Sequence, residues 1–199
     1  RLMDFLLNWL ASIPAFAVPF ALATLGLIIT EKSGVLSLGA EGFMLVGALA
    51  GVGAAFGMGL PPEAALIVAG LAAAVVSLLF ALLVIVLRIN QVIAGLAIVF
   101  FAQGLTSLIA TQRGWTNKMI SGLQPLPLGP LADIPVLGRV LFSQDIVVYL
   151  TVPIFLAAVY VMNRTMFGLK MRSVGENPEA ADAAGLNVAW YRLIAVVIG

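Results

Sequence analysis

The chain of 199 residues contains no cysteine and no histidine, and only 10% of its residues are charged. Without cysteine, the chain has no thiolate that could bind a metal, form a disulfide or act as a nucleophile. Without histidine, it also lacks the side chain that most often serves as a base or a metal ligand near neutral pH. We therefore expect no catalytic residue, no metal site and no cofactor bound by this chain. The net charge of +1 gives no sign of a nucleic-acid partner.

Charge is scarce because apolar residues dominate: 62% of the chain is hydrophobic, whereas soluble domains carry about 25% charged residues. A membrane-spanning helix needs about 20 predominantly apolar residues. Five stretches without charge reach or approach that length: residues 5–30, 42–62, 64–87, 89–112 and 146–163. The sequence therefore predicts an all-α integral membrane protein, because helices satisfy their own backbone hydrogen bonds in lipid. It also predicts membrane lipid as a partner.

A further apolar run begins at Leu193 and reaches Gly199, where the sequence given stops. We expect five full spans plus the start of a sixth, in one transmembrane domain over residues 1–199. This pattern is typical of a fragment of a longer, C-terminally incomplete chain.

Glycine and proline break the apolar pattern at a few places. Residues 34–42 hold three glycines and Glu41, which are poor helix material, and we expect a broken or re-entrant connection there. We expect Pro153 to interrupt the fifth span and two further prolines to kink the first. The pairs Gly47/Gly51 and Gly53/Gly57 have the spacing that allows helices to pack closely. The prolines of the first span are Pro14 and Pro19.

The longest polar stretch is residues 164–192, between the fifth span and the sixth. Asn177 is a typical N-cap, Pro178 suits the first helical position, and Gly185 suits the residue after the last turn. These signals predict a short helix over residues 178–184, whose alanines leave a smooth surface. Such a helix suits insertion into a groove on another protein. The alternative interpretation is a polar loop that binds nothing.

Lysine and arginine favour the cytoplasmic side of a membrane protein. If residues 164–192 are cytoplasmic, six basic residues lie inside and four lie outside, which is a weak bias in favour of this orientation. The N-terminus and the proline-rich loop over residues 113–145 are then outside. The proline and apolar content of that loop predicts an ordered cap.

The fourth span carries four neutral hydrogen-bonding residues that could line a route for a polar solute: Gln91, Gln103, Thr106 and Ser107. On an ideal helix Gln103, Thr106 and Ser107 share one face, whereas Gln91 lies about 120° away. The alternative is that these groups bond neighbouring helices together. The residues alone leave the two readings open.

Residues 175–188, GENPEAADAAGLNV, resemble the cytoplasmic coupling loop of ABC importer permeases in the ribose, simple-sugar and branched-chain amino acid superfamily. Residues 30–48 are similar to the opening signature of that family. Residues 89–97 and 134–144 resemble its nucleoside branch, which works with basic-membrane-protein-type binding lipoproteins. The resemblance implies ATPase-coupling roles for Gly175, Glu176, Asn177, Pro178, Ala181, Ala184 and Gly185.

The resemblance further implies a multi-pass permease of a prokaryotic plasma membrane, with residues 164–192 as its cytoplasmic coupling loop. Its expected partners are a separate ABC ATPase subunit that binds ATP, a second, related but non-identical permease chain, and an extracytoplasmic substrate-binding lipoprotein. The expected solute is a nucleoside or a simple sugar. Two other hypotheses are an ion-gradient-driven secondary transporter, which would normally show a buried acidic residue or a broken-helix ion site at the midplane, and a membrane scaffold without transport.

Overall fold

The computed structural model describes residues 2–116, 118–119, 122–127, 129 and 137–199. In that part of the chain the regular elements are all helical, with no strand. In chain order they are α1 (Leu2–Lys32), α2 (Ala40–Met58), α3 (Pro62–Ala81), η1 (Leu82–Val86), α4 (Gln91–Gln112), α5 (Leu137–Leu141), α6 (Ile146–Arg164), α7 (Met166–Glu176), α8 (Pro178–Ala183) and α9 (Val188–Ile198).

Five of these helices are long and apolar enough to cross a membrane, namely α1, α2, α3 with η1, α4 and α6. The five predicted spans are therefore confirmed, and α9 follows as a shorter apolar helix of 11 residues. Pro153 does not interrupt the fifth span, because it lies inside the continuous helix α6. Asn90 does not belong to the fourth span; its side chain caps α4 by accepting hydrogen bonds from the backbone N–H groups of Val92 and Ile93.

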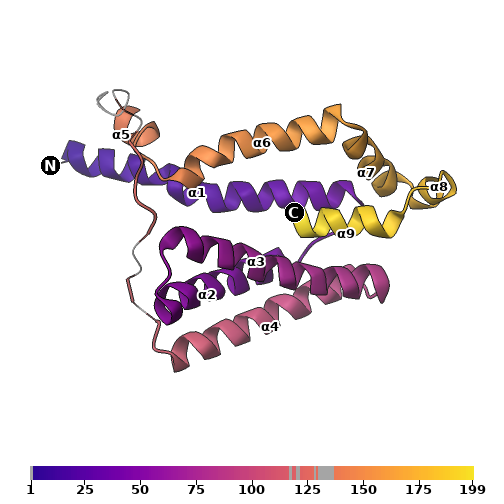
Figure 1. Ribbon diagram of the computed structural model, residues 1–199, viewed down its shortest axis with the longest axis horizontal. Helices are drawn as coiled ribbons and strands as arrows, with labels where there is room; N and C mark the ends of the chain where they lie inside the picture. Colours follow the sequence, from indigo (N-terminus) through magenta and orange to yellow (C-terminus); the bar gives the residue numbers. More distant parts are fainter. Residues whose placement is uncertain (1, 117, 120–121, 128, 130–136) are drawn as a thin grey trace.

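The long helices form two groups that run in similar directions (Figure 1). In one group α2 packs against both α3 and α4, and in the other α1 packs against α6. Helix α9 lies between the groups, since it contacts α1 on one side and α3 on the other. Helices α7 and α8 lie at one end of the molecule, opposite the N-terminus and α5 (Figure 1).

Small residues allow the close packing inside the first group. Gly42 lies against Ile98 of α4, and Gly47 and Gly51 lie against Ala69 of α3. An added Cβ at Gly42 would meet the Ile98 side chain at 2.9 Å, so the two helices approach too closely for a larger residue. The Gly47/Gly51 pair thus packs helices as predicted, whereas Gly57 faces open space.

The main hydrophobic core lies near the α8 end of the molecule. Its buried residues come from η1, the ends of α3 and α4, α9 and the connection between α1 and α2: Val35, Phe80, Ala81, Val84, Ala94, Ile98 and Val196. Phe43 packs edge-on against Phe80, with ring centroids 5.8 Å apart. This core joins the connection after α1 to helices from the middle of the chain and to α9.

The loop before α6 is anchored at several described points. Gln144 donates from its amide nitrogen to the backbone oxygens of Ala11 and Val140 at 2.7 and 2.8 Å, and Leu126 N–H bonds to the Gln144 carbonyl. These anchors accord with the predicted ordered cap. The rest of that prediction concerns residues 117, 120–121, 128 and 130–136, which lie outside the described part of the chain.

Candidate functional site

The candidate site is built at the end of α6, where the chain turns sharply into α7. The Thr165 hydroxyl caps α7 by accepting a hydrogen bond from Gly168 N–H. Helix α7 is amphipathic and buries Met171 and Val174, which are 1% and 0% exposed, while the helix contacts α1, α6 and α9. This buried face fixes α7 on the body of the protein and holds the chain that follows in a defined position.

Helix α8 has the start and the stop that the sequence predicts. The Asn177 side chain accepts a hydrogen bond from Ala180 N–H at 3.0 Å, and Pro178 occupies the first turn. At the other end Gly185 has φ +83°, and the N–H groups of Gly185 and Leu186 bond to the carbonyls of Asp182 and Ala181. This pair of bonds is a Schellman motif, which satisfies carbonyls at a helix end and favours glycine. Six residues are therefore held as a defined helix.

The sequence predicts a smooth alanine surface on α8, but not all of these alanines face outward. Ala181 is only 4% exposed, and α8 contacts α7 and α9. Ala184 is exposed, as are Glu176, Asn177 and Gly185. The face open to a partner is thus small-sided and acidic, and it contains Glu179, Ala180, Asp182, Ala183 and Ala184.

Gly175 has a different place from the other coupling candidates. It lies near the C-terminal end of α7, where its backbone meets the end of α1. An added Cβ would collide with the Lys32 carbonyl oxygen and would lie 3.0 Å from Gly34 N. Gly175 therefore sets the position of α7 against α1.

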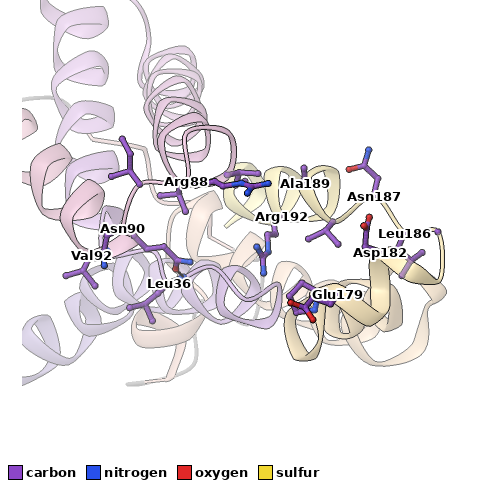
Figure 2. Close-up of a pocket in the computed structure, with 17 residues that line it drawn as sticks. Leu36, Arg88, Asn90, Val92, Glu179, Asp182, Leu186, Asn187, Ala189 and Arg192 are labelled. Atoms are coloured by element: carbon purple, nitrogen blue, oxygen red, sulfur yellow. Dashed lines mark hydrogen bonds between the residues drawn. The ribbon is translucent and has the colours of Figure 1, made fainter.

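A cleft of about 1120 Å³ opens beside α8 (Figure 2). One side is the connection between η1 and α4, including Arg88 and Asn90, and the other is α8 with the start of α9. The cleft brings basic Arg88 and Arg192 into the same space as the acidic side chains Glu179 and Asp182 (Figure 2). Residues far apart in the sequence thus form one polar surface at the α8 end.

Arg88 has an unusual backbone, with φ +55°, which non-glycine residues rarely adopt. It follows η1, a π-helical last turn of α3, in which Leu87 N–H bonds to the Leu82 carbonyl. Such turns are uncommon and often occur at functional sites. In the sequence Arg88 simply separates the charge-free stretches 64–87 and 89–112, and nothing in the apolar pattern distinguishes a π turn from an α turn.

The four candidate path residues do not share one environment. Gln103 and Ser107 are exposed on α4, and Thr106 is partly buried with a hydroxyl that has no hydrogen-bond partner among the described residues. Gln91 lies at the other end of α4, where its side-chain oxygen accepts a hydrogen bond from Leu36 N–H. Gln103, Thr106 and Ser107 therefore lie close together on α4. Gln91 lies at the other end of the helix and is hydrogen-bonded to the connection after α1.

Sequence reasoning missed the contacts that the connection between α1 and α2 makes with later helices. Arg192 Nε donates to the Ser33 carbonyl at 3.3 Å, and Gly95 of α4 packs against Leu38 and Gly39. The signal for the α4 contact in the sequence is a glycine at position 95, which the pattern does not distinguish from Gly104 in the same helix.

Comparison with known proteins decides the class of the chain. Residues 9–199 match the family described as the permease component of the branched-chain amino acid transport system. The chain belongs to this family. Because this permease-family chain has five helices of membrane-spanning length, it is a multi-pass membrane protein. No solved structure matches the chain.

Three curated relatives carry more specific names. The chain is 37% identical to the guanosine ABC transporter permease NupQ of Bacillus subtilis over 92% of this chain and 60% of the relative. It is 36% identical to the putative glucose ABC transporter permease TsgC13 of Haloferax volcanii over 99% of this chain and 60% of the relative. It is 31% identical to the nucleoside ABC transporter permease NupC of Lactococcus lactis over 94% of this chain and 62% of the relative. The chain thus spans about three fifths of the length of these relatives.

The resemblance stated from the sequence is confirmed by the family and by the two nucleoside-named relatives. Family membership also supports an ABC permease over the ion-gradient-driven alternative, because the named relatives are ABC transporter permeases. The interpretation of the chain as a transport component has the same support.

Proposed function

We propose that the protein is a membrane-spanning permease subunit of an ABC importer, with residues 1–199 belonging to a single permease domain. The observation that carries the proposal is α8, a capped helix with an exposed small-sided face at one end of a bundle of apolar helices. A helix without bulky side chains can enter a groove on a partner, and its caps keep it folded before it binds. Residues 164–192 are then the cytoplasmic coupling loop.

The partner at α8 is a separate ATPase subunit, which binds and hydrolyses ATP. A second permease chain, related but not identical, completes the pathway, and a lipoprotein on the outer surface delivers the solute. The proposed location is a prokaryotic plasma membrane, with α8 in the cytoplasm. We propose a small polar solute, either a nucleoside or a simple sugar, since the relatives are named for guanosine, nucleosides and glucose.

The path for that solute is proposed to follow α4 near Gln103, Thr106 and Ser107, with Gln91 nearer the cytoplasmic exit. Neutral hydroxyl and amide groups can replace water around a polar solute without holding it as tightly as a charge would. The exposure of Gln103 and Ser107 leaves these groups available to a solute.

The coupling role is tested by changing the size of Ala184. The full-length permease is reconstituted in proteoliposomes with its ATPase, its second permease chain and its binding protein, and uptake and ATP hydrolysis are measured together. Because Ala184 is exposed, Ala184→Trp should leave the fold intact but prevent close docking of α8. We expect solute uptake per ATP hydrolysed to fall roughly tenfold, within the range of typical coupling energies.

Ala184→Ser is the matched control, because it adds one polar atom without much volume, and it should transport like the unaltered chain. Uptake by Ala184→Trp equal to that of Ala184→Ser, at equal expression, would rule out α8 as the docking helix. Absence of ATP-dependent uptake by the unaltered complex would contradict the importer function itself.

A further inference from the structure

The connection between α1 and α2, residues 33–39, is irregular, and alternate residues of it are buried, whereas Leu36 and Leu38 are exposed. Ser33 and Val35 are 0% and 1% exposed, and Val35 belongs to the core shared by α3, η1, α4 and α9. Ser37 is also buried. We call these residues the 33–39 link. Its buried face packs on neighbouring elements, and irregular backbone at membrane depth is tolerated where protein surrounds it.

One side of the 33–39 link contacts the helices that carry α8. Gly34, with φ +81°, lies against Gly175 of α7, and an added Cβ at Gly34 would meet the Gly175 Cα at 3.2 Å. From α9, Arg192 donates its hydrogen bond to the Ser33 carbonyl. Backbone therefore packs directly on backbone where the link meets α7, with no side chain between them.

The other side of the link contacts α4 in the same manner. An added Cβ at Gly95 would lie 2.9 Å from the Leu38 carbonyl carbon and 3.0 Å from Gly39 N. One helical turn earlier, the Gln91 side chain accepts the hydrogen bond from Leu36 N–H. Two neighbouring points on α4 thus hold the link, one by close packing and one by a hydrogen bond.

From these contacts we infer that the 33–39 link connects α7 and α8 mechanically to α4. Side chains can change rotamer to absorb a small shift, but two backbones in contact cannot. A displacement of α7 by a partner bound at α8 must therefore move the link, and the link must carry the start of α4 with it. This inference rests on the proposed function, and it identifies the element that transmits docking at α8 to the helix with the candidate path residues.

The first test uses glycines of α4 that differ only in their contacts. Gly95→Ala places a Cβ against the link, whereas Gly104→Ala adds the same methyl group where no atom lies within 4 Å. In the reconstituted complex, we expect Gly95→Ala to assemble with the ATPase and to hydrolyse ATP. Its uptake per ATP should fall roughly tenfold, since substitutions within coupling networks change coupling by about 2- to 30-fold. Gly104→Ala should transport normally.

A second measurement keeps the inference testable if Gly95→Ala fails to fold. Cysteines at Leu36 of the link and Val92 of α4, which line the same cleft, are joined by a short, reducible bifunctional thiol reagent, and residues 1–199 have no native cysteine to interfere. If the link and α4 move as one unit, uptake after cross-linking should equal uptake before it. Single-cysteine chains treated with the same reagent are the control.

Two results would overturn the inference while leaving the proposed function intact. In the first, the unaltered complex transports, the Gly95→Ala chain is folded, and its uptake per ATP equals that of Gly104→Ala. The other is cross-linked protein that stops transporting and recovers on reduction, because the link and α4 would then have to slide past each other. If the unaltered complex shows no ATP-dependent uptake, the proposed function fails, and the inference fails with it.

Discussion

At the scale of single residues, the sequence predicts the ends of α8 because those signals are local. Asn177 caps the helix with its own side chain, and Gly185 supplies a left-handed backbone without a steric cost. The burial of individual alanines is not local. Ala181 and Ala184 are chemically identical, and only the packing of α8 against the body of the protein makes the first buried and the second exposed.

Because Ala181 is buried, a bulky substitution at this position tests the packing of α8 on the protein before it tests docking of a partner. Ala181→Trp would place a large side chain in a site that is 4% exposed, and overpacking a buried site typically costs about 1–3 kcal/mol. We expect the thermal midpoint of the detergent-purified protein to fall by several degrees, at about 2–4 °C per kcal/mol. Ala184→Trp should leave the midpoint within a degree or two of the unaltered chain. Equal midpoints for the two variants would contradict the burial of Ala181.

At the scale of helices, long apolar runs predict the five spans because length and hydropathy decide whether a helix crosses a membrane. Shorter elements follow weaker signals. Helix α7 lies within the polar stretch after α6. Its apolar residues form a buried face because α1, α6 and α9 cover them, and the local sequence does not show that cover. The π turn of η1 has the same apolar composition as the helix before it, so no residue in the sequence predicts it.

Helix α4 carries the prediction about the solute path. Within the part of the chain that the structure describes, the buried hydroxyl of Thr106 has no partner, and an unsatisfied buried polar group costs about 1–3 kcal/mol. If no neighbouring helix bonds to it, Thr106→Val should leave stability unchanged or raised. The double variant Gln103→Leu/Thr106→Val should then assemble, keep basal ATP hydrolysis and lose most solute uptake, measured with radiolabelled nucleoside or sugar.

The two readings of this polar stripe separate in that experiment. A double variant that fails to assemble would show that the stripe bonds helices together. Normal uptake would show that the solute does not pass these side chains. Ser107→Ala, a smaller change on the same exposed part of α4, should reduce uptake by less than the double variant.

At the scale of the whole molecule, the 33–39 link and α9 join the group of α2, α3 and α4 to the group of α1 and α6. The pairs Gly34/Gly175 and Gly95/Gly39 lie far apart along the chain, and each glycine alone is compatible with a turn, a helix end or open space. Gly104 shows how weak the signal is, because it lies in the same helix as Gly95, yet an added Cβ there would meet no atom of the described residues within 4 Å. Contacts of this kind depend on the assembled fold, and one sequence without its structure does not reveal them.

The arrangement also makes the membrane topology testable. Lys118 lies at the end opposite α8, with its ammonium group 5.7 Å from the centre of the Phe56 ring near the end of α2. Glu179 lies on α8 and is exposed.

If α8 is cytoplasmic, as the distribution of basic residues favours, a cysteine at Lys118 should react with a membrane-impermeant maleimide in intact cells. A cysteine at Glu179 should react only after the membrane is opened. Residues 1–199 have no native cysteine, and the unaltered protein treated in both conditions measures any background labelling. Labelling of Glu179→Cys but not Lys118→Cys in intact cells would place α8 outside, where an intracellular ATPase could not reach it, and the coupling role of α8 would then be excluded.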